Sequence, residues 1–328
     1  MKSLKPLIRA RFFKAVLALT LTLLILYIVP VPTVGEPVED LAQGWGKFVE
    51  IDGVKIHYVE DYGGGNLTFV LLHGFGASVF SWREVLKPLS NYGRVIAFDR
   101  PGFGLSERVD PAKAGFNPYT AEGQVELTYR LFGKLNVSKA VLIGHSAGGG
   151  VAILFTLNYP ELVEALVLVA PAWKPSRNSL HETLLYSIPL SEKYGPLVVR
   201  GFIGQLEQIL YRAWYDKSKL TEDVLEGYKY PLRAKDWDKG LYWLMKYKGF
   251  PDIRDGIGNL ETPTLIIHGL NDEIVNLSNS LELVSLLNPA AHHKLVVMDE
   301  CGHLPHEEKP DEFIQTLEEF IVNLRVSA

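Results

Sequence analysis

One ten-residue stretch, Val141–Gly150, restricts the folds open to this chain more than any other. Its first half is an apolar run typical of a buried strand, and its second half breaks into small residues around Ser146. The next residues, 151–159, are predicted to form a helix. A strand, a sharp turn with glycine on both sides of a serine, and a helix make a nucleophile elbow, which holds the hydroxyl above the edge of a sheet. The pattern predicts Ser146 as a nucleophile, although the same residues also suit a turn without chemistry.

Strand-like and helix-like segments alternate from Gly46 onward, which is typical of a doubly wound α/β fold with a mostly parallel sheet. The chain opens with a predicted hairpin whose two-residue turn is Asp52-Gly53. Ser81 is predicted to cap the helix after the first apolar strand, because Glu84 lies at capping-box spacing. The predicted strands are 47–51, 54–60, 68–72, 94–98, 139–143, 165–169, 264–269 and 294–298, and the predicted helices are 81–89, 120–135, 151–159, 278–287 and 311–324.

Residues 173–258 interrupt this alternation and contain no convincing strand. We call this segment the helical insertion. Its aromatic content indicates either the core of a helical subdomain or a lid over an apolar pocket. The predicted parts of the chain are an N-terminal signal anchor or signal peptide (1–35), a first core part (36–172), a helical cap (173–258) and a second core part (259–328). The insertion holds four of the six tryptophans: Trp173, Trp214, Trp237 and Trp243.

The N-terminal segment differs in composition from the rest of the chain. Basic residues precede an apolar run from Ala15 to Val29, which ends at Pro30. Counted to Val34, the run has about the 20 residues that span a bilayer, and no clear Ala-x-Ala cleavage site follows it. We expect a membrane anchor with its positive end in the cytoplasm and the folded domain on the extracytoplasmic side; a cleaved export signal is the alternative. The basic residues are Lys2, Lys5, Arg9, Arg11 and Lys14.

Composition limits the partners and cofactors of the chain. With 328 residues and 47% hydrophobic content, it can bury a large core. A net charge of -5 with scattered basic residues predicts no nucleic-acid partner. The only cysteine, Cys301, excludes an intramolecular disulfide and is expected to be a packed small residue. No metal or organic cofactor is predicted, because the histidines lack ligand spacing and no phosphate-binding glycine loop occurs.

Four short motifs follow one another along the chain: His73–Gly76, Gly144–Gly148, Gly269–Asp272 and Gly302-His303. Together they resemble the α/β-hydrolase superfamily over about residues 46–325, and in particular its capped serine esterases and carbon–carbon bond hydrolases. The resemblance implies an α/β-hydrolase fold with the helical insertion as its cap. Dehalogenases and epoxide hydrolases of this fold carry a carboxylate at the position of Ser146, so an alkyl-enzyme ester is not expected here.

The resemblance and the chemistry of acyl transfer assign the main roles. A serine hydroxyl needs a base within hydrogen-bond reach, and that base needs an orienting anion. His303 is expected to be the base and Asp272 the anion, each in a loop after a predicted strand, where open α/β sheets place their sites. The backbone N–H groups of Phe75 and Ala147 are expected to form the oxyanion hole.

Other side chains near the motifs are expected to shape the site. The substrate pocket is expected to include His73, Gly74, His145 and Trp173. Asp99 is expected to cap a turn rather than to react. Residues of the same types as the expected acid and base, but outside the motif positions, are Glu273, Asp299, Glu300, His268, His292, His293 and His306.

The sequence therefore predicts a membrane-anchored or exported serine hydrolase that cleaves a carboxylic ester of an apolar small molecule. A carbon–carbon bond hydrolase acting on a β-diketone, or a cofactor-free perhydrolase, would use the same three side chains. A ligand receptor on a hydrolase fold is the non-enzymatic alternative. No oligomeric state is predicted.

Overall fold

The computed structural model describes residues 5–201 and 203–327, which are built around an eight-stranded sheet in the order β1-β2-β4-β3-β5-β6-β7-β8. β1 pairs antiparallel with β2, and β2 with β4, whereas all later pairs are parallel. The expected α/β-hydrolase fold is confirmed. The strands are β1 (Lys47–Ile51), β2 (Val54–Tyr62), β3 (Leu67–Leu72), β4 (Gly93–Phe98), β5 (Ala140–His145), β6 (Val163–Val169), β7 (Thr264–Gly269) and β8 (His293–Met298).

The opening hairpin has the predicted register and turn. Ile51 of β1 pairs with Val54 of β2, so two residues form the loop. Asp52 and Gly53 have φ angles of 48° and 79°. Two consecutive positive φ values are what a type I′ turn requires, and this turn matches the twist of the flanking strands.

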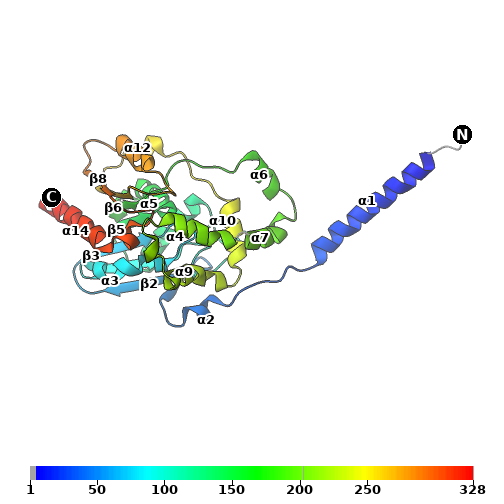
Figure 1. The fold of residues 1–328 in the computed structure, drawn as a ribbon, viewed down its shortest axis with the longest axis horizontal. Coiled ribbons are helices and arrows are strands. Elements are labelled where there is room, and N and C mark those ends of the chain that lie inside the picture. The colour runs from blue at the N-terminus through cyan, green and yellow to red at the C-terminus, as the bar shows by residue number, and fades with distance from the viewer. Residues whose placement is uncertain (1–4, 202, 328) are drawn as a thin grey trace.

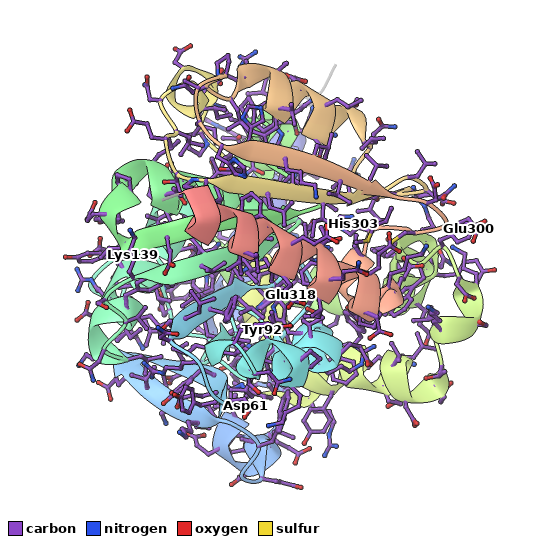
Figure 2. All side chains as sticks on the ribbon, turned by 90° about the vertical axis from the view of Figure 1, so that its left-hand side faces the viewer. Asp61, Tyr92, Lys139, Glu300, His303 and Glu318 are labelled. Carbon is purple, nitrogen blue, oxygen red and sulfur yellow. The ribbon has the colours of Figure 1, made fainter. Side chains whose placement is uncertain are left out.

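Apolar side chains of the central strands fill a layer on each face of the sheet. In β3, Val70 and Leu72 belong to one buried cluster and Phe69 and Leu71 to the other, because successive side chains of a strand point to opposite faces. Figure 2 shows the last helix lying across one face. The first layer contains residues of α4 (Ala121–Lys134), α5 (Ala147–Asn158) and α12 (Ser278–Leu286), and the second contains residues of α3 (Arg83–Ser90) and α14 (Pro310–Ser327).

The entry into α3 differs from the prediction. A 3-10 helix, η1 (Val79–Trp82), precedes α3, so Ser81 lies inside a helical turn and does not cap one. The capping residue is Ser78, whose hydroxyl accepts a hydrogen bond from the Phe80 N–H at 3.3 Å. The capping-box spacing was misleading because the chain begins to turn three residues earlier, where Ser78 offers the same side-chain chemistry.

The chain leaves the sheet between β6 and β7. Within the described residues of the helical insertion, every regular element is a helix, and the β contacts are two isolated bridges, Ser176 with Phe250 and Ala234 with Glu36. Figure 1 shows several of these helices on the side of the molecule that faces α1. They are α6 (Leu180–Tyr186), α7 (Ser191–Gly201), α8 (Leu206–Ala213), α9 (Glu222–Lys229), α10 (Trp237–Lys246) and α11 (Arg254–Ile257).

The N-terminal helix α1 (Lys5–Ile28) projects away from the rest of the molecule (Figure 1). Its segment Arg11–Ile28 has a mean hydropathy of 1.9 and no buried residue, so by length and composition it can cross a membrane. The C-terminal end of α1 contacts α7, because Lys193 Nζ donates to Leu26 O at 2.9 Å and to Tyr27 O at 2.6 Å. The expected apolar helix is therefore present; Lys2 lies outside the described residues.

Candidate active site

Ser146 lies in the sharp turn between β5 and α5, with φ 50° and ψ -120°. Residues with a side chain rarely adopt this conformation, and such strain often marks a functional site. The flanking glycines are required by close packing: a Cβ on Gly144 would lie 2.6 Å from Gly148 O, and a Cβ on Gly148 would lie 2.3 Å from Leu72 O. α5 begins at Ala147, earlier than the predicted start at Val151. The helix N-terminus thus lies directly beside the serine.

His303 and Asp272 meet at neighbouring strand ends. The distance between His303 Nδ1 and Asp272 Oδ2 is 2.7 Å. The other carboxylate oxygen, Oδ1, accepts hydrogen bonds from the N–H groups of Ile274 at 2.7 Å and Val275 at 2.8 Å. The His303 N–H donates to Ala213 O at 2.7 Å. When Nδ1 donates its proton to Asp272, Nε2 is the basic nitrogen of the imidazole.

The environment of Asp272 keeps its carboxylate charged. Burial alone would raise the pKa of Asp272, but hydrogen bonds from His268 and His303 lower it below its ordinary value. His268 Nε2 lies 3.2 Å from Asp272 Oδ2, while its Nδ1 lies 2.7 Å from Ser280 Oγ. The sequence analysis placed His268 in the predicted strand 264–269 and assigned it no catalytic role. Its position four residues before Asp272 was the available signal for this contact.

Ser146 and His303 line the same cavity, which has a volume of about 620 Å³. In the described part of the chain, the Ser146 hydroxyl and the His303 imidazole form no hydrogen bond with each other. In structures without a ligand, hydrogen bonds between catalytic groups are often long and shorten only with substrate. Most of the remaining lining is apolar and comes from the helical insertion, including Val199, Leu206, Leu210, Leu241 and Met245.

The expected oxyanion donors lie beside the elbow. Among the described residues, the N–H groups of Phe75 and Ala147 donate to no other protein group. A Cβ on Gly74 would lie 3.1 Å from Ser146 Cβ, which shows how closely the Phe75 loop approaches the serine. Phe75 lines the large cavity, and both Phe75 and Ala147 line a second cavity of about 440 Å³. The two N–H groups are therefore available to a substrate oxygen near Ser146.

Two of the four expected pocket residues line a cavity. His145 lines the large one, and its Nε2 lies 2.9 Å from His303 O, so it supports the backbone of the expected base. Burial lowers the pKa of His145 well below its ordinary value, which keeps the ring neutral. Trp173 lines the second cavity, and its indole N–H donates to Asn279 O at 3.0 Å.

His73 and Gly74 lie directly before Phe75 in the loop after β3, and they line neither of these two cavities. His73 Nδ1 lies 2.8 Å from Gly74 O, and its Nε2 accepts a hydrogen bond from the Arg100 N–H at 3.0 Å. Burial lowers the pKa of His73 to about 3, so the neutral ring can accept this bond. These contacts connect the Phe75 loop, which follows β3, to the loop after β4.

Asp99 has the expected turn-capping role. It is fully buried, with Oδ1 accepting from the Val79 N–H at 2.7 Å and Oδ2 from the Leu105 N–H at 2.7 Å. Its Oδ2 also lies 2.8 Å from His57 Nδ1. This carboxylate binds together three segments of the chain and lines neither the large cavity nor the second one.

Glu308 is a residue that sequence reasoning missed. It is the last residue of α13 (Pro305–Glu308). Its carboxylate also accepts from the Gly302 N–H at 2.8 Å and from the Tyr215 N–H at 2.8 Å. Glu308 therefore ties the loop that carries His303 to the helical insertion.

The described residues contain no group of three or more His, Cys, Asp or Glu side chains that could hold a metal ion. Cys301 is buried next to the His303 loop, and burial raises the pKa of its thiol. The thiol is therefore protonated at neutral pH, which makes it a poor nucleophile.

Comparison with known proteins gives the family. Residues 68–310 match the model described as the alpha/beta hydrolase fold. The 2-hydroxy-6-oxononadienedioate/2-hydroxy-6-oxononatrienedioate hydrolase 1 of Pseudomonas putida is 30% identical over 298 residues, which cover 84% of this chain and 96% of that protein. The uncharacterized hydrolase YugF of Bacillus subtilis is 28% identical over 273 residues, which cover 83% of this chain and 96% of that protein.

A solved structure extends the similarity to the N-terminal segment. The crystal structure of a membrane phospholipase A, described as a bacterial virulence factor, has a TM-score of 0.68 and 26% sequence identity to this chain. The similarity covers 97% of this chain and 99% of that one. Since the family model spans most of the chain and the relatives match over nearly their full length, this protein belongs to the α/β-hydrolase fold family and is a hydrolase.

Proposed function

We propose that this hydrolase cleaves carboxylic esters through an acyl-enzyme formed on Ser146. The observation that carries the proposal is a strained serine at the base of an apolar cavity that also contains His303, whose Nδ1 lies 2.7 Å from Asp272. A serine, a base and a buried anion in this arrangement are the parts that acyl transfer requires.

In the proposed mechanism, His303 takes the proton of Ser146 while the serine oxygen attacks the ester carbonyl carbon. The carbonyl electron pair moves to oxygen, and the N–H groups of Phe75 and Ala147 stabilise the resulting oxyanion. A single donor of this kind contributes about 3 to 4 kcal/mol. The tetrahedral intermediate expels the alcohol, which receives its proton from His303. Water then attacks the acyl-enzyme by the same steps and releases the acid.

We further propose that the helical insertion is a cap. Its apolar side chains form much of the lining of the large cavity, above Ser146 and His303. Such a lining excludes water and favours an apolar acyl or alcohol group. The division of the chain at residues 35, 172 and 258 belongs to this proposal.

We propose that α1 anchors the protein in a membrane. Lys193 and Tyr194 of α7 donate hydrogen bonds to the carbonyl of Leu26, at 2.9 Å and 2.6 Å, so the helical insertion adjoins the end of the apolar helix. The same region exposes large apolar side chains, which suit contact with lipid. These are Leu180, Leu184, Leu185, Ile188, Leu197 and Val198.

Carbon–carbon bond hydrolysis is the second candidate. It is supported by the 30% identity to a Pseudomonas putida protein named as a 2-hydroxy-6-oxononadienedioate hydrolase. Ester cleavage is favoured here because the similarity to the structure of a membrane phospholipase A covers 97% of this chain, whereas the match to that relative covers 84%.

A substrate panel with matched variants tests both candidates. A series of 4-nitrophenyl esters of increasing acyl length is compared with a ring-fission diketone, for the wild type and for Ser146→Ala. Ser138→Ala removes an exposed serine and is the control. We expect ester turnover and fluorophosphonate labelling in the wild type and the control, with turnover lowered by about 10³-fold or more in Ser146→Ala. Full turnover by Ser146→Ala would refute the mechanism, whereas faster cleavage of the diketone would favour the second candidate.

A further inference from the structure

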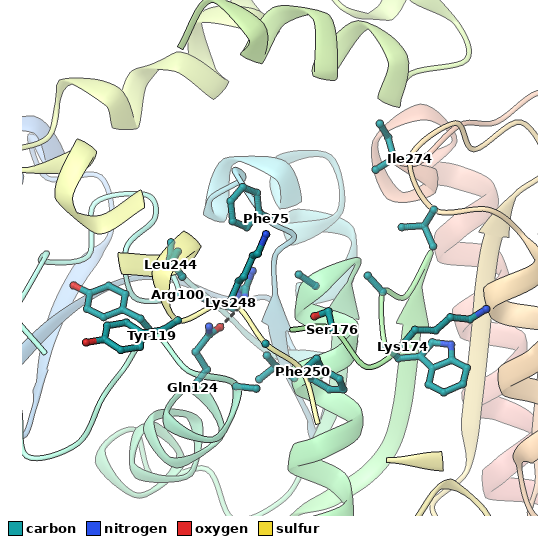
Figure 3. A pocket seen from close by; sticks show the side chains of 18 of the residues that line it. Phe75, Arg100, Tyr119, Gln124, Lys174, Ser176, Leu244, Lys248, Phe250 and Ile274 are labelled. Atoms are coloured by element: carbon teal, nitrogen blue, oxygen red, sulfur yellow. Dashed lines mark hydrogen bonds between the residues drawn. The ribbon is translucent and has the colours of Figure 1, made fainter. Parts of the chain in front are cut away.

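The second cavity next to Ser146 differs from the large one in its chemistry. Its lining includes polar and cationic side chains, among them Arg100, Gln124, Lys174 and Lys248. Figure 3 shows Arg100 and Gln124 pointing toward each other within this cavity, with Lys248 beside them. The large cavity, in contrast, is lined mainly by apolar side chains.

Arg100 is a buried cation without a carboxylate partner in the described part of the chain. It is only 2% exposed, and its Nη1 donates to the neutral amide oxygen of Gln124. Its Nε and Nη2 have no hydrogen-bond partner among the described residues. Burial lowers the pKa of Arg100 to about 9, so the guanidinium still carries its charge at neutral pH.

The other cations of the cavity already have partners. Lys174 Nζ lies 2.6 Å from Glu282 Oε2, and Lys248 Nζ lies 2.5 Å from Glu182 Oε1. Apart from the Gln124 amide oxygen, the described partner of Arg100 is the ring of Phe103, whose centre lies 5.2 Å from the guanidinium carbon. A cation–π contact offsets only part of the free-energy cost of burying a charge when no counter-charge is present. An anion that enters the cavity would supply this missing charge.

The cavity that contains Arg100 adjoins the expected oxyanion donors. Phe75 and Lys248 line both cavities, and Ala147 lines the cavity of Arg100. The two expected oxyanion donors therefore lie where the polar and the apolar cavities meet. A substrate whose carbonyl is held there can extend an apolar group into one cavity and a polar group into the other.

We propose that Arg100 and Gln124 form a subsite for an anionic group of the substrate, a carboxylate or a phosphate. This inference rests on the proposed ester hydrolysis and makes the substrate an amphiphile with an apolar chain at one end of the ester and an anion at the other. Guanidinium groups bind both anions through two parallel N–H donors. Nε and Nη2 are the donors still available on Arg100.

Two charge-matched pairs of esters test the subsite. The first pair is 4-nitrophenyl hexanoate and mono-(4-nitrophenyl) adipate, which differ by a carboxylate at the end of the acyl chain. The second is 1-hexanoylglycerol and its 3-phosphate, which differ by a phosphate on the alcohol side. The ratio of kcat/KM between the anionic and the neutral member measures the charge preference, and the pair that shows it identifies the source of the anion.

Three substitutions separate the role of Arg100 from its effect on folding. Arg100→Gln removes the charge, and Gln124→Glu places a carboxylate against the guanidinium without removing it. Arg94→Gln is the matched control, because Arg94 pairs with Glu60 at 2.6 Å and lines neither cavity. Thermal unfolding of each variant shows whether the fold is retained.

We expect the wild type to prefer the anionic member of one pair. Arg100→Gln and Gln124→Glu should each reduce this preference by about 10-fold or more, mainly through KM, because binding to the subsite is lost before chemistry. Arg94→Gln should leave the ratio unchanged. Hydrolysis of the esters with the same charge ratio in wild type and Arg100→Gln would overturn the subsite alone. No hydrolysis of any member would overturn the proposed ester hydrolysis, and the subsite with it.

Discussion

At the scale of single residues, Asp272 is the side chain on which the position of His303 depends. Each of its oxygens is occupied, one by His303 and His268 and the other by two backbone N–H groups. An amide at this position would offer one acceptor and one donor in place of two acceptors, so it could not satisfy all four partners. Loss of the charge would also favour the wrong imidazole tautomer.

We therefore predict that Asp272→Asn lowers kcat for a soluble ester by about 10³- to 10⁴-fold while the protein stays folded. The measurement is steady-state hydrolysis of a 4-nitrophenyl ester, with circular dichroism as the test of folding. Asp299→Asn is the control, because Asp299 is exposed and also near His303 in sequence. Equal activity losses in the two variants would contradict the assigned role of Asp272.

The motif residues could be predicted from the sequence, whereas their supporting residues could not. Ser146, Asp272 and His303 each follow a strand-like run, so the fold itself determines where they meet. The contacts of Arg100 with Gln124, and of Glu308 with the Tyr215 N–H, join segments that are far apart in sequence. No local pattern encodes such contacts, because they depend on how the loops pack.

At the scale of elements, α5 must lie very close to β3 to place its N-terminus beside Ser146. A Cβ on Gly148 would lie 2.3 Å from Leu72 O and 2.5 Å from His73 O, and backbone atoms cannot move aside easily. In α4, by contrast, a Cβ on Gly133 would meet nothing within 4 Å. The two helical glycines therefore provide a matched pair.

We predict that Gly148→Ala lowers the free energy of unfolding by about 1 to 3 kcal/mol, as overpacking of a dense core does, and that it also reduces ester turnover. Gly133→Ala should raise the free energy of unfolding by about 0.4 to 1 kcal/mol, because alanine restricts the unfolded chain. Urea unfolding of both variants measures these changes. A stabilising effect of Gly148→Ala would show that α5 is not held as closely as the structure indicates.

The short helix α13 places a buried carboxyl group, Glu307, against Arg83 and Tyr228. Burial raises the pKa of Glu307 from its ordinary value of 4.5 to about 7, although Arg83 and Tyr228 act to lower it. Between these two pH values the folded protein holds a proton that the unfolded chain has released. The free energy of unfolding should therefore fall as the pH rises through this range.

We predict that Glu307→Gln removes this part of the pH dependence, which amounts to about 3 kcal/mol for the full shift. Urea unfolding at pH 5 and pH 7 gives the difference for the wild type and the variant. Glu312→Gln, at an exposed position of α14, serves as the control and should resemble the wild type. The contrary result would be a free energy of unfolding that rises from pH 5 to pH 7 more in the wild type than in Glu307→Gln. That result would contradict the direction of the Glu307 pKa shift.

The elements of the sheet were easier to predict than the starts of the helices. Central strands are apolar along their whole length because both faces are covered, and this signal is local. The start of α5 was placed too late, because Ala147 and the three glycines after it have no helical pattern of their own. They are helical because α5 packs between the sheet and its neighbours, which a sequence window cannot show.

At the scale of the whole molecule, the helical insertion contacts both the active-site loops and the N-terminal helix. Glu308 joins the His303 loop to the Tyr215 N–H, and Arg200 of α7 donates to Pro32 O at 2.9 Å. Glu36 pairs with Ala234 in an isolated bridge. The segment after α1 is therefore part of the folded domain from about Pro32 onward. A functional soluble form should begin before that residue.

We predict that the full-length protein is recovered with membranes and requires detergent for extraction, whereas a variant that lacks residues 1–30 is soluble. The shortened variant keeps the contacts of Pro32 and Glu36, so its kcat for a soluble ester should stay within about 3-fold of the full-length value. A full-length control with Leu19→Arg and Leu23→Arg should also leave the membrane, because each central arginine costs about 2.5 to 3.5 kcal/mol of insertion free energy.

Protease added to spheroplasts of a bacterial host should degrade the folded domain if the basic end of α1 faces the cytoplasm. Recovery of the full-length wild type in the soluble fraction without detergent would rule out the anchor.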